Sequence, residues 1–138
     1  MNDPKQVIII RTDTEPKMRK GKMIAQGSHA SMKVIFDMMY ERKPKYGSDK
    51  WFEKGLHIDE DSPLDNWING IFKKVVVGAT NNELIDAYNK AKKNGIPCSL
   101  IEDKGLTEFD GDTTITAAAI GPDYPDIIDN ITGHLKLL

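Results

Sequence analysis

Two runs of β-branched residues, each followed by a helical pattern, constrain the fold of this chain more than any other feature. The runs cover residues 6–12 and 73–79, and their almost continuous apolar character is typical of strands buried on both faces of a sheet. After the first run, apolar residues recur at three- and four-residue spacing, which predicts a helix from about Gly21 or Lys22 to about Arg42. Two strands joined through a helix are expected to be parallel, with a right-handed crossover.

The second half of the chain continues this alternation and then departs from it. A second helix is predicted from Thr80 or Asn81 to about Asn94, because a capping residue precedes its apolar face and Gly95 follows it. Two further strands and a short helix are predicted over residues 97–102, 114–120 and 125–131. The pair Gly121-Pro122 is expected to end the fourth strand. Because the last two strands are close along the chain, they are expected to form an antiparallel hairpin, so the sequence predicts a mixed sheet of the α/β class with helices on both faces.

A chain of 138 residues is expected to form one domain, spanning 1–138. At this length it can bury roughly two-thirds of its unfolded surface, so it needs neither a disulfide nor a metal to fold. Residues 43–65 interrupt the regular pattern with prolines, glycines and the acidic run at 59–61. This segment is therefore predicted to be an expanded loop, with a helical turn around Trp51 and Phe52.

Composition excludes several classes of protein. Hydrophobic residues make up 39% and charged residues 29%, as in an ordinary globular protein. No apolar run approaches the about 20 residues that a membrane helix needs, and the first residues lack the pattern of a secretory signal. Cys98 is the single cysteine and the three histidines lie far apart, so neither a disulfide nor a metal site is expected. The simplest expectation is a cytoplasmic protein without a membrane partner.

The charge is unevenly distributed along the chain. Residues 1–54 carry 12 lysines and arginines against 7 acidic residues, whereas residues 55–138 carry 7 against 14. The net charge of −2 therefore conceals a basic first part. Such asymmetry permits a face that binds a polyanion such as nucleic acid, although a solvated charged surface is the commoner explanation.

The helix predicted to begin near Lys22 opens with a basic segment and carries a stripe of polar residues. Lys22, Gln26 and His29 stand at positions i, i+4 and i+7, which lie on one face of a helix. An ammonium, an amide and an imidazole at a helix N-terminus can hold a phosphate or a developing oxyanion. The alternative is that the stripe is only the exposed polar face of an amphipathic helix.

A second candidate group follows the predicted third strand. Ligand sites in open α/β sheets cluster outside the carboxyl ends of strands, and Asp103 lies at such an end. Lys22 follows the carboxyl end of the first strand, so the two side chains can meet at one edge of the sheet. Thr107 and Thr116 can add hydroxyl groups there. The alternative is that Asp103 only caps the turn that contains Gly105.

Several motifs occur in an order that resembles peptidyl-tRNA hydrolase of the second type, the kind first associated with archaea and eukaryotes. These are an apolar strand ending in Arg-x-Asp at 11–13, Gly-Lys-x-x-Ala-Gln-x-x-His-Ala at 21–30, Trp-x-x-Gly at 67–70, Asp-x-Gly-x-Thr at 103–107, Ile-Gly-Pro at 120–122 and the tail at 131–137. Together they cover nearly the whole chain outside residues 43–65. The chain departs from the family pattern in two places: Arg19 stands where the family usually has glycine, and the segment 43–65 is longer than is typical.

The resemblance implies a fold and an activity. The family fold is a three-layer α/β/α domain with a four-stranded mixed sheet in the order 2-1-4-3, counted along the chain, with the last strand antiparallel. Its members hydrolyse the ester between a peptide, or an N-blocked amino acid, and the 3′ end of tRNA. They use no metal or other cofactor, and many are homodimers. The resemblance therefore implies a cytoplasmic aminoacyl-tRNA hydrolase that acts in translation and binds peptidyl-tRNA.

The resemblance also assigns roles to residues. Its catalytic lysine and aspartate match Lys22 and Asp103, and its two threonines match Thr107 and Thr116, with Thr114 as a possible substitute for the second. Asp103 would activate a water molecule with help from the threonine hydroxyls, and Lys22 would stabilise the oxyanion. Supporting roles would fall to Gln26 and His29, the latter also as an alternative base. The residues expected to contact tRNA phosphates are Lys17, Arg19 and Lys20.

Two other functions remain open at this point. The same fold can serve as an RNA-binding or adaptor module without turnover, which incubation with peptidyl-tRNA would reveal. The chain can also be an esterase of a small aminoacyl compound, in which case the basic residues before the first helix would be dispensable.

Overall fold

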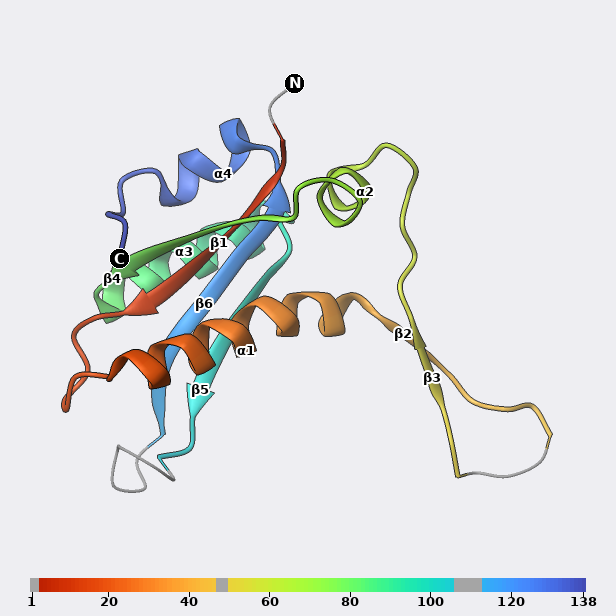
Figure 1. Cartoon of the computed structure of the whole chain (residues 1–138), viewed down its shortest axis with the longest axis horizontal. Coiled ribbons are helices and arrows are strands. Elements are labelled where there is room, and N and C mark those ends of the chain that lie inside the picture. The colour runs from red at the N-terminus through yellow and green to blue at the C-terminus, as the bar shows by residue number, and fades with distance from the viewer. Residues whose placement is uncertain (1–2, 47–49, 106–112) are drawn as a thin grey trace.

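Four strands form the central sheet of the computed structural model, which describes residues 3–46, 50–105 and 113–138. They are β1 (Lys5–Arg11), β4 (Lys73–Ala79), β5 (Cys98–Asp103) and β6 (Thr114–Asp123). Their order is β4-β1-β6-β5, with β1 and β4 parallel and β6 antiparallel to both of its neighbours (Figure 1). Counted along the chain, this is the predicted order 2-1-4-3, and the predicted mixed α/β sheet is confirmed.

Helices cover both faces of this sheet. Helix α1 (Lys20–Met38) packs across β1, β5 and β6 on one face, while α3 (Asn81–Lys93) and α4 (Pro125–Thr132) cover the other (Figure 1). The strands alternate accordingly: Ile8 and Ile10 of β1 face α1, and Val7 and Ile9 face α3 and α4. Two separate hydrophobic clusters result, one on each face, as the continuous apolar runs predict.

Small residues let α1 lie close to the sheet. A Cβ atom at Gly27 would stand only 3.2 Å from Ile8 Cγ2 and 3.3 Å from Ile10 Cδ1. Ala30 is fully buried, and its carbonyl accepts a hydrogen bond of 2.7 Å from Ser99 Oγ on β5. These contacts fix the helix against β1 and β5, so they also fix the side chains of its first turns relative to the ends of those strands.

The segment predicted as a long loop is more regular than expected. Helix α1 ends at Met38 rather than near Arg42, because Tyr40–Arg42 form strand β2, which pairs with β3 (Glu53–Gly55) in a small antiparallel hairpin. The predicted helical turn at Trp51 and Phe52 is wrong, since these residues lead directly into β3. The cross-strand pairing of Arg42 with Glu53 and of Lys54 with Glu41 favours the extended form.

Sequence reasoning also missed helix α2 (Pro63–Ile68). The signal was present, because Ser62 accepts a hydrogen bond from the backbone N–H of Asp65 and Pro63 occupies the first turn, where a missing N–H costs nothing. Trp67 anchors this helix: it is buried, and its Nε1 donates to the carbonyl of Lys73 at 2.8 Å.

The fourth strand is longer than predicted. It continues through Gly121 and Pro122 to Asp123 instead of ending there. Gly121 has a φ of +103°, which glycine adopts without a steric penalty, and its N–H donates to the carbonyl of Pro97 at 2.7 Å. The C-terminal residues lie along the free edge of β4, where Leu137 pairs with Val77. Among the described residues, no helix is both long enough and apolar enough to span a bilayer.

Candidate active site

Lys22 and Asp103 meet at the carboxyl ends of β1 and β5. Lys22 lies in the first turn of α1, and Asp103 is the last residue of β5. The Nζ of Lys22 stands 3.1 Å from Oδ2 of Asp103, and the two side chains are only 12% and 15% exposed. The alternative that Asp103 serves only to cap a turn is therefore insufficient, because this carboxylate is committed to an ammonium on another element.

The environment of the carboxylate makes this ion pair consequential. Oδ2 of Asp103 is inaccessible to solvent, and within the described part of the chain it accepts no hydrogen bond. The positive charge of the Lys22 ammonium, at ion-pair distance, therefore balances the negative charge of this buried carboxylate. Two opposite charges that are shielded from solvent attract each other much more strongly than the same charges in bulk water, because the surrounding dielectric constant is lower.

A second polar pair adjoins the first. Thr116 of β6 is fully buried, and its hydroxyl donates a hydrogen bond to Oε1 of Gln26, which is 5% exposed and lies one turn after Lys22. Lys22 and Gln26 therefore project toward the sheet, and they are not part of an exposed polar face. His29 differs: it is exposed on α1 and has no hydrogen bond or ion pair with any described residue.

A β-bulge in β6 aims Thr116 at this site. In the pairing of β5 with β6, Ile101 is opposite Ala117 but Glu102 is opposite Ile115, so Thr116 is an extra residue on β6. Regular alternation would place Thr116 and Ala117 on opposite faces of the sheet. Instead Ile115 packs with the α3 face, Ala117 packs with the α1 face, and Thr116 bonds to Gln26 of α1. The bulge thus turns the hydroxyl toward Gln26, which lies one turn after Lys22 on α1.

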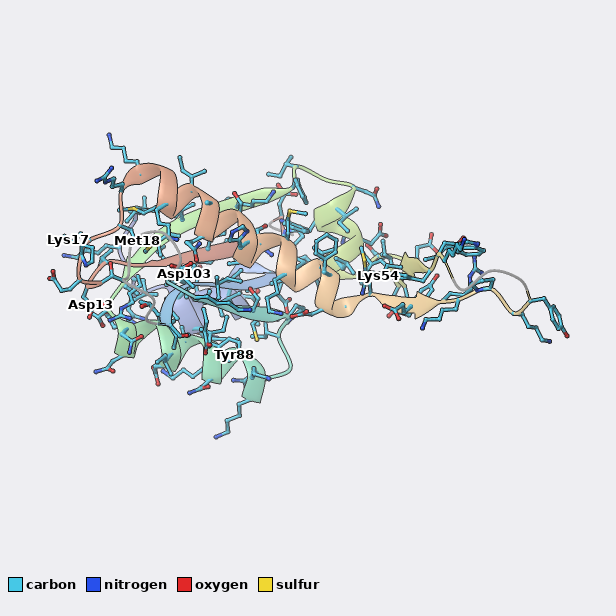
Figure 2. The ribbon with its side chains drawn as sticks, turned by 90° about the horizontal axis from the view of Figure 1, so that it is seen from below. Asp13, Lys17, Met18, Lys54, Tyr88 and Asp103 are labelled. Atoms are coloured by element: carbon cyan, nitrogen blue, oxygen red, sulfur yellow. The ribbon has the colours of Figure 1, made fainter. Side chains whose placement is uncertain are left out.

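The remaining residues singled out in the sequence fall into three groups. Thr114 is the cross-strand partner of Asp103 and remains close to the pair. Thr107 lies outside the described residues. The three basic residues around the start of α1 are exposed, on either side of the buried Met18; they are Lys17, Arg19 and Lys20. Figure 2 shows Lys17 toward the same end of the molecule as Asp103.

Sequence reasoning did not assign a role to Arg11 and Asp13, which order the neighbouring loop. Arg11 Nε donates to Asp13 Oδ1 at 2.8 Å, and the same oxygen accepts from the backbone N–H of Asn81, the first residue of α3, at 3.0 Å. The hydrogen bond from Arg11 is the main reason that the pKa of Asp13 is lowered. The Arg-x-Asp spacing after a strand was the available signal.

A pocket of about 580 Å³ adjoins this loop. Its lining includes Arg11, Thr14, Asn81 and Thr114. Thr14 is 1% exposed, and its hydroxyl has no hydrogen-bond partner among the described residues. Neither Lys22 nor Asp103 lines this pocket, but Thr114, the cross-strand partner of Asp103, does. Within the described ranges, no three His, Cys, Asp or Glu side chains are grouped to hold a metal ion.

Comparisons with known proteins place this arrangement in a family. The family model described as Peptidyl-tRNA hydrolase PTH2 matches residues 4–138. A peptidyl-tRNA hydrolase of Methanocaldococcus jannaschii is 44% identical over 97% of this chain and 99% of its own length, and one of Sulfolobus acidocaldarius is 38% identical with the same coverage.

A solved structure shows the same fold at lower sequence similarity. It is a protein of unknown function from Agrobacterium tumefaciens, with a TM-score of 0.57 and 14% identity, over 100% of this chain and 99% of the other. That likeness concerns the fold alone. The family model and the two archaeal relatives carry the conclusion: this chain belongs to the peptidyl-tRNA hydrolase PTH2 family.

Proposed function

We propose that this chain hydrolyses the ester bond between a peptide, or an N-blocked amino acid, and the 3′ end of tRNA, and that Lys22 and Asp103 are its catalytic residues. The observation that carries the assignment is the shielded pair of these two side chains, 3.1 Å apart, in a chain of the PTH2 family. An acid–base group and a fixed positive charge are the two parts that hydrolysis of an activated ester requires.

In the proposed reaction, Asp103 orients a water molecule and takes its proton as the water oxygen attacks the ester carbonyl carbon. The carbonyl oxygen becomes an oxyanion, which the ammonium of Lys22 stabilises. The bond between the carbonyl carbon and the 3′ oxygen of the tRNA then breaks, and the proton passes from Asp103 to that leaving oxygen. The products are the free peptide and free tRNA.

Thr116 and Gln26 would position the water. Because the Thr116 hydroxyl donates its proton to Gln26, its oxygen lone pairs remain available to accept a hydrogen bond from the water. Thr107 is proposed as a second hydroxyl at this place. Gln26 is then a positioning residue that acts through Thr116. His29, which is exposed two turns along α1 from Lys22, is proposed only as a support residue or an alternative base.

The exposed basic residues around the start of α1 are proposed to hold the phosphates of the tRNA acceptor end. Their charge would make binding depend on salt concentration, since each phosphate contact releases counterions. An esterase of small aminoacyl compounds would need no such residues, and an adaptor module would need no shielded acid–base pair. These residues are Lys17, Arg19 and Lys20.

We further propose that the protein is a homodimer and acts in the cytoplasm, where its substrate is made. An apolar groove of about 480 Å³ between α1 and β4 supports a dimer, because Ile24, Met32, Phe72 and Leu138 line it and are exposed. Sedimentation analysis should give twice the chain mass for the wild type and a monomer for Met32→Glu. A wild type that sediments as a monomer at micromolar concentration contradicts the dimer.

The proposed activity is tested by the release of free tRNA from N-blocked aminoacyl-tRNA. We expect turnover by the wild type and a loss of at least about 100-fold for Asp103→Asn. Asp37→Asn is a matched control, because Asp37 pairs with Lys33 on the same helix but both side chains are about half exposed. Undiminished turnover by Asp103→Asn would refute the assignment of the catalytic pair.

A further inference from the structure

A two-stranded arm extends from the C-terminal end of α1. It consists of residues 40–46 and 50–55, which contain β2 and β3, and we call these residues the hairpin arm. Figure 1 shows the arm reaching away from the sheet and its helices. It contributes no residue to either hydrophobic cluster of the core, so packing of the fold does not account for its composition.

The hairpin arm is positively charged in an otherwise acidic chain. Residues 40–55 carry five lysines and arginines against three acidic residues, whereas the rest of the chain carries 14 against 18. Arg42 and Lys54 pair across the strands with Glu53 and Glu41. Lys43 and Lys45 are exposed, and among the described residues neither has an acidic partner. The unpaired positive charge of Lys43 and Lys45 therefore follows strand β2 and does not lie within the paired strands.

Aromatic side chains accompany these lysines. Tyr46, Trp51 and Phe52 are 84%, 49% and 55% exposed. A fourth aromatic, Tyr40, has a structural role, because its ring lies across Gly55, where a Cβ atom would clash with it. Several large aromatic groups that stay exposed within one short segment indicate an interaction surface. Interleaved with lysines they suit nucleic acid, since every base offers a face for stacking and every phosphate a negative charge.

The position of the arm determines the size of the ligand that can use it. Helix α1 runs from the active site to the arm, and about 24 Å of helix separates Lys22 from Met38 at its end. Figure 2 shows Asp103 and Lys54 on well-separated parts of the molecule. No small aminoacyl ester can span this distance, but the RNA body of a tRNA whose 3′ end lies at Lys22 and Asp103 can.

We propose that the hairpin arm is a second RNA-binding site, which holds the body of the same peptidyl-tRNA whose ester lies in the active site. Lys43 and Lys45 contact phosphates, and Tyr46, Trp51 and Phe52 stack on accessible bases. The inference rests on the proposed function, because it takes the substrate to be a tRNA ester. The arm supplies affinity for the tRNA and takes no part in the chemical step.

The test compares two substrates that carry the same N-acetyl-aminoacyl group, one on full-length tRNA and one on adenosine alone. The variants are Trp51→Ala and the pair Lys43→Ala/Lys45→Ala. The matched control is Lys92→Ala/Lys93→Ala, two lysines in the last turn of α3, on the other face of the sheet. All the substituted side chains lie outside the hydrophobic clusters, so each variant is expected to fold.

We expect Trp51→Ala to raise the KM for the tRNA ester by at least about fivefold, with kcat unchanged. The lysine pair should raise KM and reduce the slope of log KM against log salt by about one to two. In both, the ratio of kcat/KM for the tRNA ester to that for the adenosine ester falls, whereas the control keeps the wild-type ratio.

Failure of the inference and failure of the proposed function are distinguishable. A wild type that cleaves the tRNA ester, with arm variants that keep its KM and salt slope, overturns the inference and leaves the function standing. Arm variants that change the sedimenting mass but not KM also overturn it, since the arm then joins two copies of the chain. A wild type that cleaves neither ester refutes the proposed function, and with it the inference.

Discussion

The ion pair between Lys22 and Asp103 allows stability and catalysis to be separated by experiment. Lys22→Met removes the compensation of a carboxylate oxygen that is hidden from solvent. Breaking a buried pair costs about 3–5 kcal/mol, and since these side chains are 12% and 15% exposed we expect the lower end, about 3 kcal/mol. Asp103→Asn is expected to cost less, about 1–2 kcal/mol, because the partial negative charge of the amide oxygen still lies beside the ammonium.

The double variant Lys22→Met/Asp103→Leu provides the decisive comparison. Replacement of a buried ion pair by apolar groups of similar volume is often neutral, so its free energy of unfolding should lie within about 1 kcal/mol of the wild type. Its hydrolysis of N-blocked aminoacyl-tRNA should nevertheless stay at least about 100-fold below the wild type, because neither the base nor the oxyanion partner is present.

Urea unfolding at pH 7, followed by circular dichroism, measures the stability, and release of free tRNA measures the activity. Lys33→Met/Asp37→Asn is the control, since that exposed pair on the same helix should contribute less than about 0.5 kcal/mol. The reasoning is refuted if Lys22→Met is as stable as the wild type, or if the double variant hydrolyses the substrate at the wild-type rate.

Three further predictions concern groups around this pair. Thr116→Val leaves the buried Gln26 amide oxygen without its hydrogen-bond donor, so the free energy of unfolding should fall by about 1–3 kcal/mol and kcat should fall as well. Thr116→Ser should retain most of kcat. Equal losses of kcat in both variants would exclude a role for the hydroxyl. Arg11 lowers the pKa of Asp13, so the ionised carboxylate of Asp13 stabilises the fold above its ordinary pKa of 3.8, and this stabilisation is lost as the pH falls through the lower folded value. The stability difference between the wild type and Asp13→Asn should therefore vanish in strong acid. A constant difference down to pH 2 would contradict this. A triple alanine variant removes the basic residues around the start of α1, which are Lys17, Arg19 and Lys20. It should raise the KM for peptidyl-tRNA and make that KM less dependent on salt. An unchanged salt dependence of KM would favour the small-ester alternative.

Much of the fold was accessible from the sequence because its strongest signals are local. The two apolar runs become β1 and β4. Thr80, one of the two residues predicted to cap the second helix, precedes α3, where its side chain and that of Glu83 form a reciprocal capping box. The hairpin β2–β3 was not accessible, because its strands of three residues each are too short to show a period. Cross-strand ion pairs hold it together, and their partners are known only once the register is known.

The site shows the same division between local and non-local information. The spacing of Lys22 and Gln26 is a property of one helix, and their common face followed from the sequence. The exposure of His29 did not follow, because the width of the buried stripe depends on how closely α1 approaches the sheet. That approach is set by Gly27 and Ala30 against β1 and β5, which are contacts between distant parts of the chain.

Thr116 is the clearest case of a residue that only the sheet could orient. Strict alternation from Ala118, which packs on the α3 face, would place Thr116 on that same face, away from Lys22. The bulge opposite Ile101 and Glu102 adds one residue to β6 and reverses this assignment. Residues on the α3 face thus keep their register with β5 and β1, while one hydroxyl crosses to the α1 face. The bulge therefore turns a residue near the start of β6 toward α1, while the core residues that follow it keep their places on the two faces of the sheet.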